Sequence, residues 1–485
     1  METLPRLQIA KESRIVFILI CPPGGIIGKT LWEMILLAAN NEFLGTERMG
    51  RLLFRLSAPT ICAQLINMLY NVVDRMYIGH IPETGALALT GLGVCMPVIM
   101  VVSAFAAFVS MGGAPRASIA MGRGDSEGAK DILGTCFVLQ LILSVILTAV
   151  LLLWNRPMLL AFGASADTIG YASDYMTVYA VGTLFVQLTL GMNAFITAQG
   201  FSGFGMLTVA IGAVLNIALD PLFIYTFDMG VKGAALATVL SQAVSAVWAT
   251  YFLTSRRSVL KLERGRMRLR PSILLGCLSL GVAPFIMQAS ESVINVCYNT
   301  SLARYGGDTA VGAMTILSSV MMFAMLPIQG LGQGAQPIIS YNYGAKKFGR
   351  VRQCYKYLLL SGTVFCSVLW GAVQLFPGVF ARMFTSDAAL AGYAEDVLRV
   401  YMAMSFLFGV QIACQMTFIS IGYAKESVCV ALARKVALLI PLIYLLPRLI
   451  SDQTLAVFLA EPVADTLAVI FTAILFAVKF KKLPA

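Results

Sequence analysis

The 485-residue sequence is poor in charge and nearly free of histidine. Only 12% of its residues are charged, whereas about a quarter are charged in soluble domains. It has one histidine, His80, and ten cysteines with no CxxC pair, which excludes the usual zinc spacings and argues against a disulfide framework. Without a cluster of nucleophile, base and metal ligands, we expect no enzymatic activity, no catalytic residues and no cofactor.

Hydrophobic residues make up 59% of the chain, in stretches of about 20 residues that match the thickness of a bilayer. The fold class that this predicts is all-α integral membrane protein with twelve transmembrane helices, six in each half. The expected helices span residues 52–78, 86–112, 131–154, 172–197, 204–226, 231–253, 272–300, 309–336, 354–376, 392–419, 427–447 and 453–478.

The two halves of the chain repeat each other. Pro115 and Pro337 lie 222 positions apart, and the same offset relates seven further pairs: Ser118/Ser340, Gly122/Gly344, Phe162/Phe384, Tyr171/Tyr393, Asp174/Asp396, Tyr179/Tyr401 and Gly200/Gly422. A unit with an even number of spans keeps its orientation, so we expect two homologous six-helix bundles related by an axis along the membrane normal. The solute pathway of such duplicated transporters lies between the repeats.

Lysine and arginine collect in alternate loops. Seven lie between 255 and 270, four between 346 and 352, and three after residue 478. The positive-inside rule therefore predicts cytoplasmic termini and a solvated cytoplasmic linker. The net charge of +11 then reflects topology, and we expect no nucleic-acid partner.

The expected domains are an N-terminal segment at 1–48, a six-helix bundle at 49–254, a basic linker at 255–271, a second bundle at 272–478 and a tail at 479–485. The segment 1–33 is too short in its apolar part to span a bilayer, and Met34 or Met49 is an alternative start.

Two acids stand out in the apolar helices of the first half. Asp74 lies about 33 Å along the first helix and Asp220 about 24 Å along the fifth, at 1.5 Å per residue. Asn216 shares a helix face with Asp220, and Pro221 frees a backbone carbonyl. Charges within spans mark function by default, although Asp74 has a structural alternative as the partner of Arg75.

Three segments carry a family resemblance. These are Asp74 followed by Gly79, the stretch Asn216-x-x-x-Asp220-Pro-Leu-Phe-Ile, and Gly230-Val-Lys-Gly-Ala-Ala-Leu-Ala-Thr238-Val-Leu-Ser-Gln. From about residue 41 onward the chain resembles the multidrug and toxic compound extrusion (MATE) transporters, in particular their MepA-like branch. The resemblance implies a V-shaped cleft between the bundles, and export of cationic, amphipathic drugs in exchange for a proton or sodium ion.

The resemblance also implies site residues. The coupling-ion site, with a possible Na⁺ at Asp74 and Asp220, maps to Asp74, Asn193, Asn216, Asp220 and Thr238. Glu291 matches a helix-seven glutamate of some members, but the region of Gln411 and Gln415 lacks the acid that they carry in helix ten. We therefore expect Glu291 to meet the charge of the drug, and the predicted substrate-binding set is Glu291, Met287, Gln288 and Met314.

A further charge group is expected in the second bundle, where Arg434 and Asp465 lie at similar depth and Glu461 lies one turn from Asp465. The expected partners of the protein, which we take as a monomer, are small cationic drugs and membrane lipids. The alternative function is a flippase for a lipid or a lipid-linked oligosaccharide. That alternative needs cationic residues in the cleft, whereas the buried charges of the first bundle are acidic.

Overall fold

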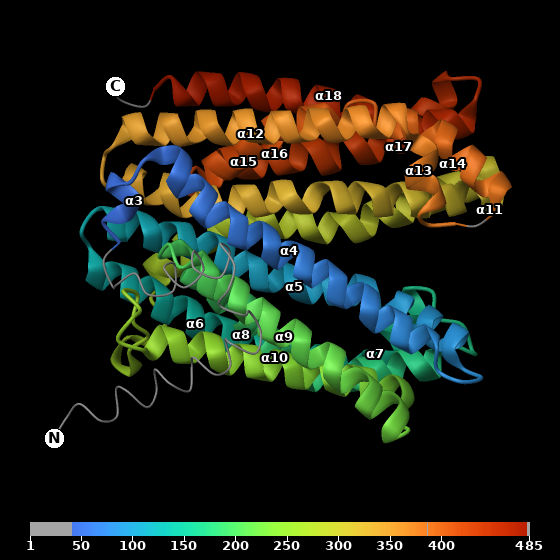
Figure 1. Cartoon of the computed structure of the whole chain (residues 1–485), viewed down its shortest axis with the longest axis horizontal. Coiled ribbons are helices and arrows are strands. Elements are labelled where there is room, and N and C mark those ends of the chain that lie inside the picture. The colour runs from blue at the N-terminus through green and yellow to red at the C-terminus, as the bar shows by residue number, and fades with distance from the viewer. Residues whose placement is uncertain (1–40, 386, 483–485) are drawn as a thin grey trace, which may run out of the picture. The chain divides into compact units, whose positions relative to one another are not determined.

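The computed structural model describes residues 41–385 and 387–482, and these residues form helices and loops (Figure 1). Long apolar stretches become helices because a bilayer offers no partner for free backbone groups. The first bundle contains α4 (Met49–Gly79), α5 (Gly85–Gly122), α6 (Ser126–Leu153), the short α7 (Asn155–Ala161), α8 (Ile169–Ala198), α9 (Ser202–Pro221) with the π-helical η1 (Leu222–Thr226), and α10 (Gly230–Thr254).

The second bundle follows a linker that contains the short η2 (Arg264–Arg266). Its elements are α11 (Pro271–Gly344), α12 (Phe348–Leu375), α13 (Pro377–Arg382), α14 (Ala388–Tyr401), η3 (Ser405–Leu407), α15 (Phe408–Ser420), α16 (Ala424–Leu432), the π-helical η4 (Ala433–Leu439), α17 (Ile440–Leu449) and α18 (Gln453–Phe480).

The twelve expected spans are present in the described part of the chain. Ten helices are long and apolar enough to cross a membrane, and the pair α14 and α15, bent by 47°, adds an eleventh. The twelfth comes from α11, which at 74 residues would be about 110 Å long as one rod. Gly307, with φ 64° and ψ −162°, breaks it into two antiparallel halves, a conformation that glycine adopts without a Cβ clash.

The main difference from the sequence prediction lies at the helix ends. The second helix continues ten residues beyond 112, to Gly122, and the eighth continues eight beyond 336, to Gly344. The tenth span was expected to be one helix, but it is interrupted between Tyr401 and Phe408. Hydropathy marks the part of a helix that lies in the bilayer, so it does not mark where the helix ends.

The repeat explains how the bundles meet. Gly122 and Gly344 close α5 and α11 and pack reciprocally: a Cβ on Gly122 would lie under 3.0 Å from the carbonyl oxygen of Tyr341, and one on Gly344 equally close to that of Ile119. Ser118 also donates a hydrogen bond to the carbonyl oxygen of Pro337, at 3.3 Å. The conserved spacing of the two halves therefore places equivalent residues against each other at one end of the interface. We call this end, where the linker also lies, the linker end.

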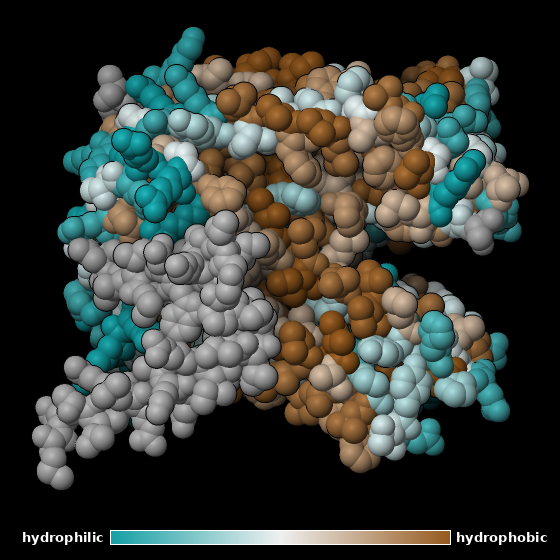
Figure 2. Space-filling model, in the orientation of Figure 1, coloured by the Kyte–Doolittle hydropathy of each residue, from teal (hydrophilic) through white to brown (hydrophobic). Residues whose placement is uncertain are grey.

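Toward the other end the bundles separate. The space-filling view shows a hollow between the two bundles there, with apolar surface on the first bundle beside it (Figure 2). This is the cleft that the family resemblance implied, and it is open at the end where α4 meets α5 and α13 meets α14.

The linker is attached to the first bundle, which corrects the expectation of a solvated segment. Arg266 and Arg270 both form ion pairs with Asp131 on α6, at 2.9 Å for Arg266. The side-chain oxygen of Gln199 accepts hydrogen bonds from the backbone N–H groups of residues 259 and 260, both at 2.9 Å. The basic residues of the linker therefore also have a structural use.

The short helix α3 (Phe43–Thr46) belongs with the second bundle. Asn342 donates to the carbonyl oxygen of Leu44 at 2.8 Å, and Lys347 donates to that of Gly45 at 3.0 Å. The alternative start Met34 and the segment 1–33 lie outside the described residues.

Candidate functional site

The first-bundle acids are buried. Asp220 lies one residue before the end of α9 with no exposed surface, and Asp74 on α4 is 6% exposed. Pro221 has no N–H to donate, and the chain continues as the π-helical η1 directly after it, a feature common at functional sites. The sequence thus places a helix irregularity beside the most deeply buried carboxylate of this bundle.

Asn216 joins two of the predicted ligands. Its amide nitrogen lies 3.2 Å from Oδ1 of Asp220 and 3.4 Å from the hydroxyl of Thr238 on α10. The first contact follows from the four-residue spacing on one helix, and the second from the packing of α9 against α10. Asn216, Asp220 and Thr238 therefore form one polar group.

Asp74 lies close enough to Asp220 for the two carboxyl groups to interact electrostatically. Among the described residues it forms no ion pair with Arg75, whose guanidinium instead contacts the sulfur of Met96 at 3.4 Å. Arg75 still interacts electrostatically with the Asp74 carboxylate, so the alternative role of Asp74 as the partner of Arg75 is not overturned. Oδ1 of Asp74 and Oδ2 of Asp220 are buried without a hydrogen-bond donor among the described residues.

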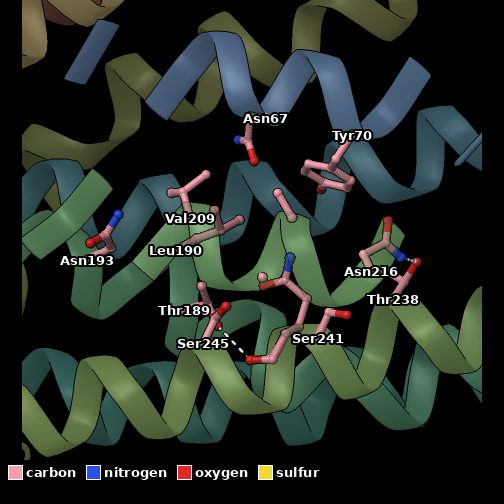
Figure 3. A pocket seen from close by; sticks show the side chains of 13 residues that line it. Asn67, Tyr70, Thr189, Leu190, Asn193, Val209, Asn216, Thr238, Ser241 and Ser245 are labelled. Carbon is pink, nitrogen blue, oxygen red and sulfur yellow. Dashed lines mark hydrogen bonds between the residues drawn. The ribbon is translucent and has the colours of Figure 1, made fainter. Parts of the chain in front are cut away.

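A small cavity adjoins this group (Figure 3). Its volume is about 40 Å³, which is room for an ion or a few water molecules and too little for a drug. Asn216 and Thr238 lie at one end of it, and Asn193 lies at the other (Figure 3). Of the five predicted ligands, Asn193, Asn216 and Thr238 therefore line this cavity, whereas Asp74 and Asp220 are not among its lining residues.

The donor set fits a hard monovalent cation or a proton. Besides the two carboxylate oxygens, Oδ1 of Asn193 and Oδ1 of Asn216 are buried without a donor. Buried polar atoms normally have a partner, so unpartnered oxygens beside a polar cavity favour a ligand that supplies positive charge. Among the residues that the structure describes, no lysine or arginine lines the cavity.

Sequence reasoning missed the aromatic part of this site. Tyr70 lines the cavity and lies within electrostatic range of both Asp74 and Asp220, and Tyr175 on α8 forms a hydrogen bond with Thr238. Tyr70 lies four residues before Asp74, so its place on the same helix face was readable from the spacing. Tyr175 reaches the site by helix packing, and no local pattern indicates that.

The charge group of the second bundle is brought together in the structure. Nε of Arg434 lies 2.7 Å from Asp465 and Nη2 lies 3.6 Å from Glu461. Glu461 also accepts a hydrogen bond from Tyr298 at 3.0 Å, and the guanidinium lies 4.9 Å from the ring centre of Phe408. These acids form ion pairs with a basic residue, whereas Asp74 and Asp220 form none within the part of the chain that the structure describes.

Glu291 pairs with a residue that sequence reasoning missed. The ammonium of Lys435 lies 2.7 Å from its Oε1. The lysine side chain is 8% exposed and that of Glu291 is 44% exposed, so the lysine approaches from inside the bundle. Lys435 lies in the π-helical η4, where its side chain points in a different direction than it would in a regular helix. No sequence pattern predicted this π-helical turn.

Helix geometry places Glu291 beside the cleft. Cys277, Gly281 and Phe285 on α11 contact α5, and the next residue on that face is Gln288, which is exposed. Glu291 lies three residues further on, so it flanks the surface that the first bundle leaves uncovered.

The other predicted substrate residues differ in position. Met287 is half-buried and shares the face of Glu291, four residues away. Met314 is 4% exposed within the hydrophobic core of the second bundle, so its burial does not favour direct contact with a substrate in this state.

Known proteins resemble this chain along most of its length. The multidrug export protein MepA of Staphylococcus haemolyticus is 23% identical over 85% of this chain and 90% of its own. The protein of the same name from Staphylococcus saprophyticus is 26% identical over 73% and 78%. A solved structure described as the outward-facing conformation of a multidrug resistance MATE family transporter has a TM-score of 0.86, with 23% identity over 92% of this chain and 98% of its own.

The family model named MatE matches residues 59–222 and 284–445. The two matched segments fall on the two bundles and leave out the linker, as expected if one unit was duplicated. The chain therefore belongs to the MatE family of membrane transport proteins, and within it resembles the MepA-like members.

Proposed function

We propose that this protein exports cationic, amphipathic compounds in exchange for a proton or a sodium ion. The observation that carries the proposal is the pair of buried acids Asp74 and Asp220, which form no ion pair among the described residues. Asp220 is hydrogen-bonded to Asn216, which lines a cavity of ionic size. An isolated buried carboxylate is costly, so the pair needs a proton or a cation when the site is closed.

The coupling follows from this need. Binding of the ion would neutralise Asp220, with Asp74, Asn216 and Thr238 supplying the other oxygens and Asn193 the far end of the cavity. Release on the opposite side would restore the charge. A cation and a drug drive exchange when each favours a different conformation of the two bundles, which is the thermodynamic condition for antiport.

The drug itself would lie in the cleft. Glu291 supplies a negative charge at its side, Met287 and Gln288 supply adaptable contacts next to it, and Met314 would support them from the core. The absence of lysine and arginine from the first-bundle cavity, and the pairing of Arg434 and Lys435 with acids, do not favour the diphosphate of a lipid-linked sugar. We therefore prefer the exporter to the flippase.

The membrane orientation is part of the proposal. Lysine and arginine gather at the linker end, so both termini would lie in the cytoplasm of a bacterial cell and the cleft would open outward. We take the monomer as the transporting unit.

The test is transport in liposomes. Ethidium movement is followed under an imposed proton gradient and then under a sodium gradient, for the native chain and for Asp220→Asn. Asp174→Asn is the matched control, because Asp174 lies in the same bundle with a half-exposed side chain paired with Lys232. Loss of gradient-driven transport in Asp220→Asn alone supports the proposal, and the gradient that works names the ion. Normal export by Asp220→Asn would overturn the site.

A further inference from the structure

A second cavity lies at the linker end of the second bundle, away from the site described above. It is a groove of about 510 Å³ among α12, α15 and α18. Its lining residues are Arg352, Tyr355, Lys356, Val410, Cys414, Ala473, Phe476, Ala477, Phe480 and Lys481. Three of them are basic and none is acidic.

The floor and wall of the groove are aromatic. The rings of Tyr355 and Phe476 stack at 4.5 Å, and those of Phe476 and Phe480 stack at 4.6 Å. The tyrosine hydroxyl is already in contact with the sulfur of Cys414, at 3.5 Å. The wall therefore offers a flat apolar surface without an unsatisfied polar group, which suits a hydrocarbon chain.

The basic residues lie at the rim. Lys356 and Lys481 are exposed, and neither takes part in an ion pair among the described residues. Arg352 lies one helical turn before Lys356 on α12, and Lys481 directly follows the end of α18. A neighbouring lysine, Lys479, forms an ion pair with Glu426 at 2.6 Å.

We propose that this groove binds one anionic phospholipid, with the phosphate over Lys356 and Lys481 and an acyl chain along the aromatic wall. Basic pockets between transmembrane helices near the cytoplasmic surface are suited to anionic headgroups, and an apolar wall beneath them adds the selectivity for a lipid over a free anion. The orientation of the groove toward the cytoplasmic leaflet rests on the proposed topology, whereas binding itself does not depend on transport.

The experiment uses the full-length protein in neutral detergent. Phosphatidylglycerol and phosphatidylcholine are titrated separately, and bound lipid is counted by native mass spectrometry while thermal unfolding is followed in parallel. We expect one retained phosphatidylglycerol and a rise in Tm, because a ligand that binds only the folded state stabilises it. The double variant Lys356→Gln/Lys481→Gln should lose this lipid, with about a fivefold weakening for each charge removed.

The matched control removes two charges from the same end of the molecule. Arg257→Gln/Lys261→Gln alters exposed linker residues that do not line the groove, and it should keep the lipid. Equal losses in both double variants would show general attraction to a basic surface and would overturn a built site.

Two further arms identify the occupant. Phe480→Ala should weaken phosphatidylglycerol but leave any binding of glycerol phosphate unchanged. If glycerol phosphate displaces the lipid completely and Phe480→Ala has no effect, the groove is an anion site and the lipid proposal is wrong. If deletion of residues 483–485 exposes a lipid site that the native chain lacks, the C-terminus is the occupant and the proposal is likewise overturned.

Discussion

Replacing Gly344 by alanine should shift the protein toward the state in which its linker end is open. A Cβ on Gly344 would lie under 3.0 Å from the backbone carbonyl of Ile119, and a backbone atom has no side-chain rotamer with which to move away. The two helices α5 and α11 must therefore separate at their crossing. Alternating access requires the same crossing to open, so the substitution penalises one conformation and spares the other.

Overpacking of this kind costs about 1–3 kcal/mol, which corresponds to about a 5-fold to 150-fold change in the ratio of the two states. Alanine also stabilises a helix by about 1 kcal/mol relative to glycine, but this stabilisation applies to both conformations and leaves their ratio unchanged. The reciprocal change Gly122→Ala acts on the same crossing. The double variant should cost less than the sum of the single ones, because a crossing already spread has room for the second methyl group.

The assay is the labelling rate of Cys277 by a maleimide, with the other cysteines replaced. Cys277 lies in the interface between α11 and α5 and is 1% exposed, so it reacts only when the bundles separate. We expect Gly344→Ala to label at least five times faster than the native chain. Gly93→Ala is the control, because a Cβ there meets nothing within 4 Å. Equal labelling of Gly344→Ala and Gly93→Ala would refute the reasoning.

Three further predictions concern the second bundle. Lys435→Met should tighten ethidium binding by about tenfold, because the lysine ammonium no longer competes for Glu291 and a hydrogen bond to a charged group contributes about 1.5 kcal/mol. Glu291→Gln should weaken ethidium binding. Unchanged ethidium affinity in both variants would contradict the pairing of Lys435 with Glu291. Asp465→Asn should lower the free energy of unfolding by about 3–5 kcal/mol in denaturant titration, because it leaves a buried guanidinium without its closest partner. Met314→Ala should cost about 2–5 kcal/mol of stability with little effect on affinity, whereas Met287→Ala should change affinity with little loss of stability.

The sequence was sufficient for those parts of the molecule that depend on spacing along one helix. The twelve spans, the repeat and the contact of Asn216 with Asp220 all belong to this class. Contacts between helices were not readable in the same way. Lys435 reaches Glu291, and Tyr175 reaches Thr238, through packing angles and a π-helical turn that composition does not encode. The attachment of the linker was missed for the same reason, since its partner Asp131 is more than 130 residues away.

The two bundles share a framework but differ in their chemistry. Duplication preserved Gly122 and Gly344, because any side chain at either position would obstruct the same crossing. It did not preserve the charges. Among the described residues, Asp74 and Asp220 of the first bundle are buried without an ion pair, whereas the acids of the second bundle are paired with Arg434 and Lys435.

This asymmetry has a functional consequence. A buried group that supplies its own counter-charge has less need of an external ion, so the demand for a coupling cation falls on the first bundle. If a drug cation binds at Glu291 as proposed, it meets the opposite situation and must compete with Lys435, which is fixed in the protein. In the proposed mechanism ion and drug would act on different bundles of one molecule. Their exchange would then depend on the interface between those bundles, which the paired glycines hold closed at the linker end.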